Sequence, residues 1–375
     1  MKNIFLKAEA AVLILIFVFS FFVGERLTTD INEEKCNTGA TEALAMIANA
    51  ENLHSEGTKV SSRFLELLLG KGKKEPLMLC PSGEAFGILI HEDGVTVCTS
   101  QGGGLEVGDK IIKIGAKNCY ESDEVYEAVR ESGGAPLKMT LIRGGEEISV
   151  SVTPKYKDGE YRLGVTLRSQ TAGIGTITFY DPNTLTFGGL GHSVSDSESG
   201  LPVSIKSGVA SGVLLGNCKR GEAGRAGELS GILTRNVLGD IVKNTECGIF
   251  GKLEKSPALK SDPLPVGTRS DVKCGEAEII STVKNGRTAS YKIEIEELDP
   301  TSESLKSFKI KVTDPTLIAL TGGIVRGMSG SPIIQNGKLV GAVTHVMVAD
   351  PTEGYGIFIE NMLSAAQDRV VPKAA

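Results

Sequence analysis

Apolar and polar residues alternate over short stretches in most of the chain beyond residue 156, as in β-strands that bury one face. The alternation is clearest in 173–180, 291–296 and 308–312. Asn285-Gly286 and Asn336-Gly337 lie between such stretches, and Asn-Gly is typical of two-residue hairpin turns. We therefore predict an all-β domain over residues 156–375, built as a sandwich or as a pair of barrels.

Residues 77–155 show a different pattern, in which short strands surround a single helix. The helix is expected from Ser122 to Arg130, because Ser122 can cap its start and the apolar Val125 and Val129 share one face. Strands are expected in 86–90, 95–98, 110–114, 137–143 and 147–152. This mixture indicates a separate, small α+β domain.

The first residues of the chain form an apolar run from Ala10 to Val23, which follows two lysines and ends before a charged pair. A basic flank followed by a short apolar run is typical of a secretory signal or an N-terminal membrane anchor. We expect residues 1–26 to direct export, with the lysines left on the cytoplasmic side. The polar residues 27–76 are expected to form a linker or a propeptide-like segment.

Composition and charge narrow the possible chemistry. The 375 residues suggest two or three domains, and the net charge of −6, from 40 basic against 46 acidic residues, argues against a nucleic-acid partner. The 46 glycines predict many tight turns, whereas only four histidines can supply an imidazole. Neither HExxH nor GxxxxGK[ST] occurs, so we expect no metal and no nucleotide cofactor.

The most informative motif is Gly327-Met328-Ser329-Gly330, just before a predicted hairpin. A nucleophilic serine needs its hydroxyl exposed on a tight turn, with backbone N–H groups directed at the oxyanion. The N–H groups of Gly327 and Ser329 could supply those donors, as in chymotrypsin-like peptidases. Gly-Ser-Gly sequences also form ordinary turns, so the motif alone leaves a non-catalytic turn open.

His192 is the best candidate for a general base, since it ends the glycine-flanked run 188–192 upstream of the serine. A histidine in the first barrel and a serine in the second is the order of chymotrypsin-like peptidases, in which the imidazole takes the serine proton and returns it to the leaving amine. His54 and His91 are expected at the surface. His345 follows the strand after the serine, and it either lines a substrate pocket or packs in the fold.

Residues 77–155 resemble a PDZ domain. The resemblance is carried by the strings 85–88 and 105–112, which match a carboxylate-binding loop and the turn and strand of such domains. In PDZ domains the loop binds a C-terminal carboxylate, and the peptide adds as a strand to the sheet edge. A small α+β domain with a solvated edge is the alternative. The residues thereby implied to bind peptide C-termini are Ala85, Phe86, Gly87 and Ile88.

The chain as a whole resembles the stage IV sporulation protein B peptidases of endospore-forming bacteria. The strings that carry this resemblance are 171–180, 190–192, 247–251, 311–338 and 345–360. Matched by position, the resemblance implies catalytic roles for His192, Asp314 and Ser329. Asp314 lies only fifteen residues before Ser329, whereas Asp240, forty-eight residues after His192, fits the usual chymotrypsin-like spacing. The choice between these two acids stays open.

The predicted architecture is therefore an N-terminal signal anchor, a PDZ-like α+β domain and a chymotrypsin-like double β-barrel peptidase domain. The resemblance implies an exported, membrane-associated serine endopeptidase of the space between forespore and mother cell. It would cleave itself and then one protein substrate at a membrane surface. That substrate would be a membrane-bound regulator, and its cleavage would lead to activation of a late sigma factor. The alternative is a secreted PDZ adaptor with an inactive peptidase-like domain, which the presence of both His192 and Ser329 disfavours.

Overall fold

The computed structural model describes residues 76–196, 200–255, 261–284 and 286–367. The apolar run near the start of the chain and nearly all of the segment 27–76 lie outside the described residues, so the predictions made for them stay predictions. Within the described ranges, no helix is both long and apolar enough to cross a membrane.

Strands dominate the described chain, as the alternating pattern predicts. Those of the first half are β1 (Met78–Pro81), β2 (Ala85–Ser100), β3 (Lys110–Ile114), β4 (Lys117–Asn118), β5 (Leu137–Arg143), β6 (Glu146–Val152), β7 (Lys155–Lys157), β8 (Glu160–Arg162), β9 (Val165–Tyr180) and β10 (Thr186–Gly189). Those of the second half are β11 (Ile205–Lys219), β12 (Glu228–Thr245), β13 (Gly248–Leu253), β14 (Leu264–Pro265), β15 (Gly275–Lys284), β16 (Arg287–Leu298), β17 (Phe308–Val312), β18 (Pro332–Gln335), β19 (Lys338–Val346) and β20 (Glu353–Phe358). The helical elements are α4 (Ser122–Glu131), η1 (Arg269–Asp271), α5 (Pro315–Thr321) and α6 (Ile359–Gln367).

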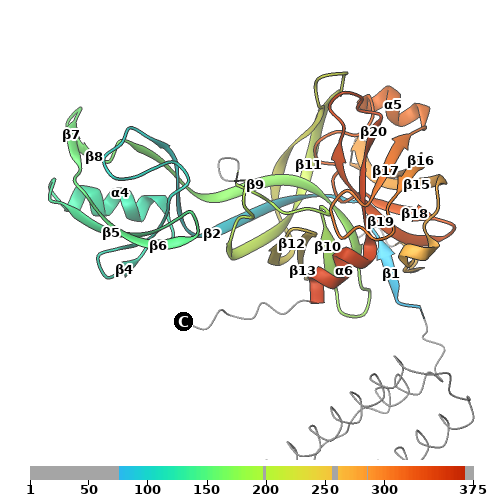
Figure 1. Cartoon of the computed structure of the whole chain (residues 1–375), viewed down its shortest axis with the longest axis horizontal. Helices are drawn as coiled ribbons and strands as arrows, with labels where there is room; N and C mark the ends of the chain where they lie inside the picture. The colour runs from blue at the N-terminus through green and yellow to red at the C-terminus, as the bar shows by residue number, and fades with distance from the viewer. Residues whose placement is uncertain (1–75, 197–199, 256–260, 285, 368–375) are drawn as a thin grey trace, which may run out of the picture. The chain divides into compact units, whose positions relative to one another are not determined.

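The strands β15 to β20 close into a barrel in the order β15-β16-β17-β20-β19-β18, which we call the second barrel (Figure 1). The predicted hairpin at Asn336-Gly337 joins β18 to β19, with both residues at positive φ (51° and 73°) as a type I′ turn requires. Alternate side chains of the strands point inward and form one apolar core. Its large members include Ile279, Ile293, Phe308, Ile333 and Phe358.

A second closed ring precedes it and is called the first barrel. Antiparallel pairings run from β9 to β10, β13, β12, β11 and β2, and β2 pairs back with β9. Its core is a separate apolar cluster that includes Phe86, Ile90, Ile177, Phe187 and Ile249. The prediction of a mostly β fold built on closed barrels is therefore confirmed.

The strands β2 and β9 are both sixteen residues long, and each belongs to two structures (Figure 1). Residues 85–91 of β2 and 170–176 of β9 pair within the first barrel. The ladder then shifts register between His91 and Thr96, next to Gly94 with a φ of 134°, and continues with residues 165–168 of β9. Beyond this shift the two strands join β3 to β6 and α4, which we call the α4 module (residues 95–168).

The α4 module has its own buried core, and its helix and hairpin agree with the predicted ones. The helix runs from Ser122 to Glu131, although its N-cap is Glu121 rather than Ser122, and it buries Val125 and Val129. The strands β5 and β6 pair from Leu137↔Val152 to Arg143↔Glu146 around two glycines at positive φ. The core residues include Val95, Val97, Leu105, Ile111, Met139 and Leu141.

The structure corrects the position of the predicted carboxylate-binding loop. Ala85, Phe86, Gly87 and Ile88 begin β2 and pair with β9. Gly87 and Ile88 also pair with β11 on the other side, so their backbone groups are already bonded in a ladder. All four residues are buried. They form a wall of the first barrel, and both backbone edges of Gly87 and Ile88 are already paired. Residues 85–91, which the prediction assigns to the domain of residues 77–155, therefore belong to the first barrel.

Candidate active site

The turn that carries Ser329 connects the segment after α5 to β18, and its glycines fix its shape. Gly327 and Gly330 have φ values of 99° and 94°, a region that residues with a Cβ rarely adopt. A Cβ on Gly330 would lie 2.2 Å from the carbonyl oxygen of Thr176 and 2.5 Å from the backbone nitrogen of Leu190. This close approach packs the turn of the second barrel directly against the first barrel.

Hydrogen bonds hold Ser329 between the two barrels. Its carbonyl oxygen accepts from the N–H of Thr176 on β9 at 3.1 Å, and the Thr176 hydroxyl donates to the Gly327 carbonyl at 2.9 Å. The Ser329 hydroxyl donates to the carbonyl of Thr344 on β19 at 2.8 Å. The serine is partly buried, and its hydroxyl must leave Thr344 to meet a base.

His192 lies in the loop that follows β10, and the residues before it contact the serine turn. Leu190 donates its N–H to the Thr176 carbonyl at 3.2 Å. Gly330 packs against both of these backbone groups. Gly191, at a φ of 69°, leaves room for Thr344, since a Cβ there would lie 3.1 Å from the Thr344 methyl carbon. The two residues that precede the predicted base thus pack against Gly330 of the serine turn and against Thr344 of β19, whose carbonyl accepts from the Ser329 hydroxyl.

The chemistry of the His192 ring suits a general base. Its Nδ1 lies 2.8 Å from the Ser193 carbonyl, which only accepts, so Nδ1 carries the proton and Nε2 of the neutral ring has a free lone pair. Burial lowers the pKa of His192, and the bond to Ser193 offsets part of that effect. The imidazole is therefore neutral near pH 7 and can accept a proton at Nε2.

His345 lies against His192, with the ring centroids 5.4 Å apart and the planes tilted by 41°. Its Nδ1 is buried and has no hydrogen-bond partner among the described residues. Burial lowers the pKa of His345, and the neighbouring His192 and Lys306 lower it further. The sequence left two positions open for His345, one lining a substrate pocket and one packed in the fold. In the structure its ring is partly buried and packs against His192.

Asn244 on β12 positions the loop that carries His192, a role that sequence reasoning missed. Its Oδ1 accepts from the N–H of Val194 at 2.8 Å, and its Nδ2 donates to the carbonyls of Val194 and Val203 at 2.7 and 2.8 Å. An asparagine in a predicted strand carries no signal of this role, because its partners become neighbours only through strand pairing.

The two candidate acids occupy positions different from that of a triad acid. Asp314 is the N-cap of α5, where Oδ1 accepts from Thr316 and Leu317 at 2.8 and 3.1 Å and Oδ2 accepts from the Lys292 N–H at 3.3 Å. Burial raises the pKa of Asp314, but these backbone bonds outweigh it and leave the pKa lowered. Within the described chain neither oxygen bonds to His192.

The alternative acid, Asp240, is exposed on β12, where its strand-pair partners are Val209 of β11 and Lys252 of β13. Among the residues that the structure describes, no carboxylate accepts from Nδ1 of His192, whose proton goes to the Ser193 carbonyl instead. The expectation of a third, acidic member of the site, drawn from the resemblance and from spacing, does not agree with these positions.

The candidate oxyanion donors are available. In the part of the chain that the structure describes, the N–H groups of Gly327 and Ser329 take no part in a hydrogen bond, whereas those of Met328, Gly330 and Ser331 bond to carbonyls. The N–H groups of Gly327 and Ser329 thus remain free to donate, which is what the predicted oxyanion-binding role requires.

Two six-stranded barrels, a histidine loop on the first and a Gly-x-Ser-Gly turn on the second define the class of chymotrypsin-like serine peptidases. A family model described as SpoIVB peptidase S55 matches residues 159–363. The chain belongs to this family, and the predicted family and class of enzyme are confirmed.

Curated relatives match shorter stretches. The serine protease HTRA1 of Xenopus laevis is 32% identical over 139 residues, which cover 33% of this chain and 29% of that protein. The zinc metalloprotease RasP of Geobacillus kaustophilus (strain HTA426) is 35% identical over 79 residues, or 21% of this chain and 16% of that protein. The chain thus spans less than a third of the length of these relatives.

Solved structures with a similar course of the chain are also proteases. The active form of the Rv3671c protease from M. tuberculosis has 11% identity and a TM-score of 0.32, over 52% of this chain and 72% of that one. The HtrA-type protease AlgW with a decapeptide has 8% identity and a TM-score of 0.33, over 76% of this chain and 64% of that one.

Proposed function

We propose that the chain is an active serine endopeptidase in which Ser329 is the nucleophile and His192 the general base. The observation that carries the proposal is the packing of Gly330 and Thr344 against Leu190 and Gly191, because it brings the serine turn to the histidine loop. Leaving the Thr344 carbonyl costs the hydroxyl one hydrogen bond, about 1 kcal/mol, which a bond to the imidazole replaces.

The reaction then follows from the positions of the donors. The proton of the Ser329 hydroxyl passes to Nε2 of His192 as the oxygen bonds to the substrate carbonyl carbon. The resulting oxyanion is stabilised by the N–H groups of Gly327 and Ser329. His192 returns the proton to the amine as the C–N bond breaks, and a water molecule, activated by the same imidazole, hydrolyses the acyl-enzyme.

The test uses the full chain as wild type, Ser329→Ala and His192→Ala, with a fluorophosphonate probe and with self-cleavage as readouts. Wild type is expected to be labelled at Ser329 and to fragment, whereas both variants stay intact and unlabelled. Equal fragmentation of wild type and Ser329→Ala contradicts the proposal. A folded wild type without labelling favours the inactive adaptor instead.

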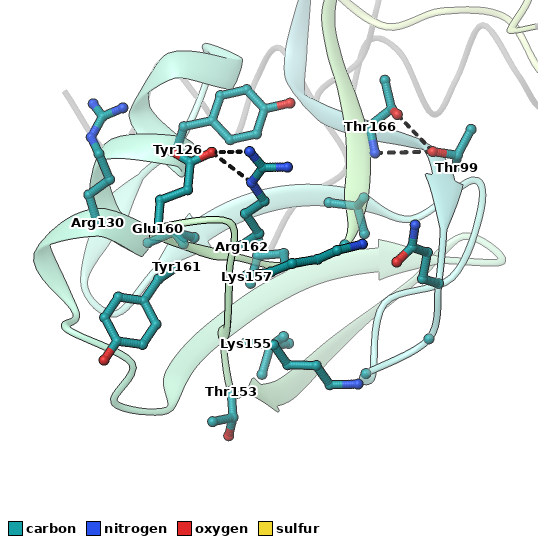
Figure 2. A pocket seen from close by; sticks show the side chains of 18 of the residues that line it. Thr99, Tyr126, Arg130, Thr153, Lys155, Lys157, Glu160, Tyr161, Arg162 and Thr166 are labelled. Atoms are coloured by element: carbon teal, nitrogen blue, oxygen red, sulfur yellow. Dashed lines mark hydrogen bonds and ion pairs between the residues drawn. The ribbon is translucent and has the colours of Figure 1, made fainter.

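We also propose a peptide groove in the α4 module, at a place other than residues 85–88. A cavity of 470 Å³ lies between α4 and the start of β9, and Tyr126 and Arg130 of α4 line it together with the residues that precede β9 (Figure 2). Residues 165–168 of β9 pair only with β2 among the described strands, so their other edge can accept a strand.

The charges around this cavity suit a chain terminus. Arg130, Lys155, Lys157 and Arg162 line it together with Asp123 and Glu160, and Glu160 is paired with Arg162 at 2.5 Å. The excess of positive charge would meet a free carboxylate. Gly164, at a φ of 73°, precedes the strand in the run Leu163-Gly164-Val165, as expected of a loop that turns its N–H groups to an anion. A fluorescent peptide with a free C-terminal carboxylate should bind the full chain more tightly than its amidated form.

The biological role that we propose follows from the family. The role is limited proteolysis during sporulation, by an enzyme exported across the forespore membrane and held at its surface by the N-terminal segment. The match to the SpoIVB peptidase family over residues 159–363 supports the proteolysis. The enzyme would cleave itself and then a membrane-bound regulator, upstream of a late sigma factor. A strain that carries only Ser329→Ala should form forespores, yet should not express a reporter of that sigma factor.

A further inference from the structure

A buried carboxylate lies where the α4 module meets the first barrel. Glu92 of β2 is 2% exposed, within the register shift between β2 and β9. One oxygen accepts from Nε of Arg168 at 3.0 Å and from the Thr171 hydroxyl at 2.9 Å, and the other accepts from the Thr96 hydroxyl at 2.9 Å. A buried carboxylate with these partners is stable only while its cation stays in place.

The other end of the same guanidinium holds the loop of the candidate base. Nη2 of Arg168 forms an ion pair with Asp196, whose side chain is 11% exposed. Asp196 lies four residues after His192, and its backbone is itself bonded to Leu201 and Gly200. The base loop is therefore attached at two points, to Asn244 through Val194 and to the buried Glu92 through Arg168.

Arg168 does not line the cavity of the α4 module but is close along the chain to residues that contact it. On β9 it lies two residues after Thr166, which lines the cavity and is bonded to Thr99 (Figure 2). The next residue, Ser169, donates to Glu121, the N-cap of α4, at 2.9 Å. A displacement of β9 or of α4 by a bound peptide would thus reach Arg168 through directly bonded neighbours.

We infer that Arg168 is a positioning residue that sets the place of His192 and links the groove of the α4 module to the reactivity of Ser329. The inference rests on the proposed function, since it concerns the same base and nucleophile. The planar guanidinium of arginine donates from two of its edges, and here Nε bonds Glu92 while Nη2 pairs with Asp196. A lysine ammonium is a point charge, so it can pair well with only one of these carboxylates.

The experiment compares the rate of fluorophosphonate labelling in the full chain for wild type, Arg168→Gln and a matched control. Arg143→Gln is the control, because Arg143 also bonds a fully buried carboxylate, that of Asp109 at 2.6 Å, but inside the α4 module and away from the base loop. We expect Arg168→Gln to lower the labelling rate roughly 10- to 100-fold, as for a base misplaced by about 1 Å. Arg143→Gln should stay within about twofold of wild type, even if both variants unfold at a lower temperature.

Three further readouts separate positioning from loss of fold. Asp196→Asn should lower the rate as Arg168→Gln does, and the double variant should lose little more, because both changes cut the same link. Arg168→Lys should recover part of the rate. The pH midpoint of labelling should rise in Arg168→Gln, since a displaced His192 is less buried.

The possible outcomes distinguish the inference from the function on which it rests. If wild type is not labelled while Ser329→Ala is equally silent, the proposed function fails. If wild type reacts and Arg168→Gln reacts as fast as Arg143→Gln, the function stands and the inference is wrong. Additive losses in Arg168→Gln and Asp196→Asn would also overturn it.

Discussion

The two imidazoles beside Ser329 respond to pH together. Burial lowers the pKa of His192 and also of His345, and each ring lies within 5.4 Å of the other. A proton on one ring makes a proton on the other less favourable. Both rings are therefore neutral near pH 7, and acid is expected to affect the two together.

This arrangement predicts that the fold loses stability in mild acid. In the unfolded chain both histidines have the ordinary pKa near 6.5, so below that pH the unfolded state binds more protons than the folded state and stability falls. The loss is complete once the pH is below the folded-state values. We expect the Tm of His345→Gln to fall less than that of wild type between pH 7 and pH 5, measured by thermal unfolding.

The same argument sets the pH dependence of the reaction. The labelling rate at Ser329 should fall only below the ordinary histidine value of about 6.5, because the base has a lowered pKa. An acid loss of Tm that is equal in wild type and His345→Gln contradicts the explanation.

Some residue roles could be predicted from the sequence because their signals are local. The turns that carry Ser329 and His192 are predicted from their glycines, and Gly191, Gly327 and Gly330 do have positive φ values, whereas the catalytic roles of the two residues stay proposals. Asn244 and Arg168 could not be found in this way. Each acts on the base loop from a strand that is distant in sequence, so its role exists only after the strands have paired.

At the scale of elements, α5 determines how the chain approaches the nucleophile. The helix begins at Pro315, which suits a first helical position, and ends at Gly322 with a φ of 79°. Asp314 caps its first turn with two backbone bonds. A Cβ on Gly322 would lie 2.2 Å from the Gly221 carbonyl, so the end of the helix is fixed against the loop after β11.

Variants of Asp314 distinguish a helix cap from a triad acid. Asparagine caps a helix about as well as aspartate, whereas alanine removes the cap at a cost of about 1 kcal/mol. We expect Asp314→Asn to keep the wild-type labelling rate, and Asp314→Ala to lower the Tm by roughly 2–4 °C with a smaller effect on the rate. If Asp314→Asn folds like wild type and loses its labelling, the acid acts on His192 and the capping role is insufficient.

The elements also show where short motifs mislead. An apolar-Gly-apolar triplet occurs at Phe86-Gly87-Ile88 and again at Leu163-Gly164-Val165. The first is paired in a barrel wall, while the second opens β9 beside the cavity of the α4 module. The triplets look alike because a buried strand and a tight loop both accept glycine between apolar residues. Only the partners of each strand, which the local pattern does not contain, separate the two.

At the scale of the whole molecule, the candidate site depends on the contact between two barrels that have separate cores. The hydroxyls of Thr176 and Thr178 on β9 donate to the carbonyls of Gly327 and Gly330 at 2.9 and 2.7 Å. These bonds connect the first barrel to the backbone of the nucleophile turn. We call this contact between the barrels the seam. If Ser329 and His192 react as proposed, the seam sets the distance between them, and a change at the seam should affect catalysis more than it affects either core.

Gly330→Ala tests this dependence, with Gly337→Ala as the matched control. Both glycines have positive φ values, 94° and 73°, so each alanine introduces backbone strain of about 1–2 kcal/mol. A Cβ at residue 337 meets no atom within 4 Å, whereas a Cβ at residue 330 meets the Thr176 carbonyl and Leu190 of the other barrel.

We therefore expect Gly337→Ala to lower the Tm modestly and to keep the labelling rate of Ser329. Gly330→Ala should lower the rate roughly 100-fold, because the serine turn must move away from the histidine loop by about 1 Å to admit the methyl group. Circular dichroism of the folded variants checks that both barrels persist. A Gly330→Ala variant that is folded and labelled as fast as Gly337→Ala would mean that the seam does not set the geometry of the reaction.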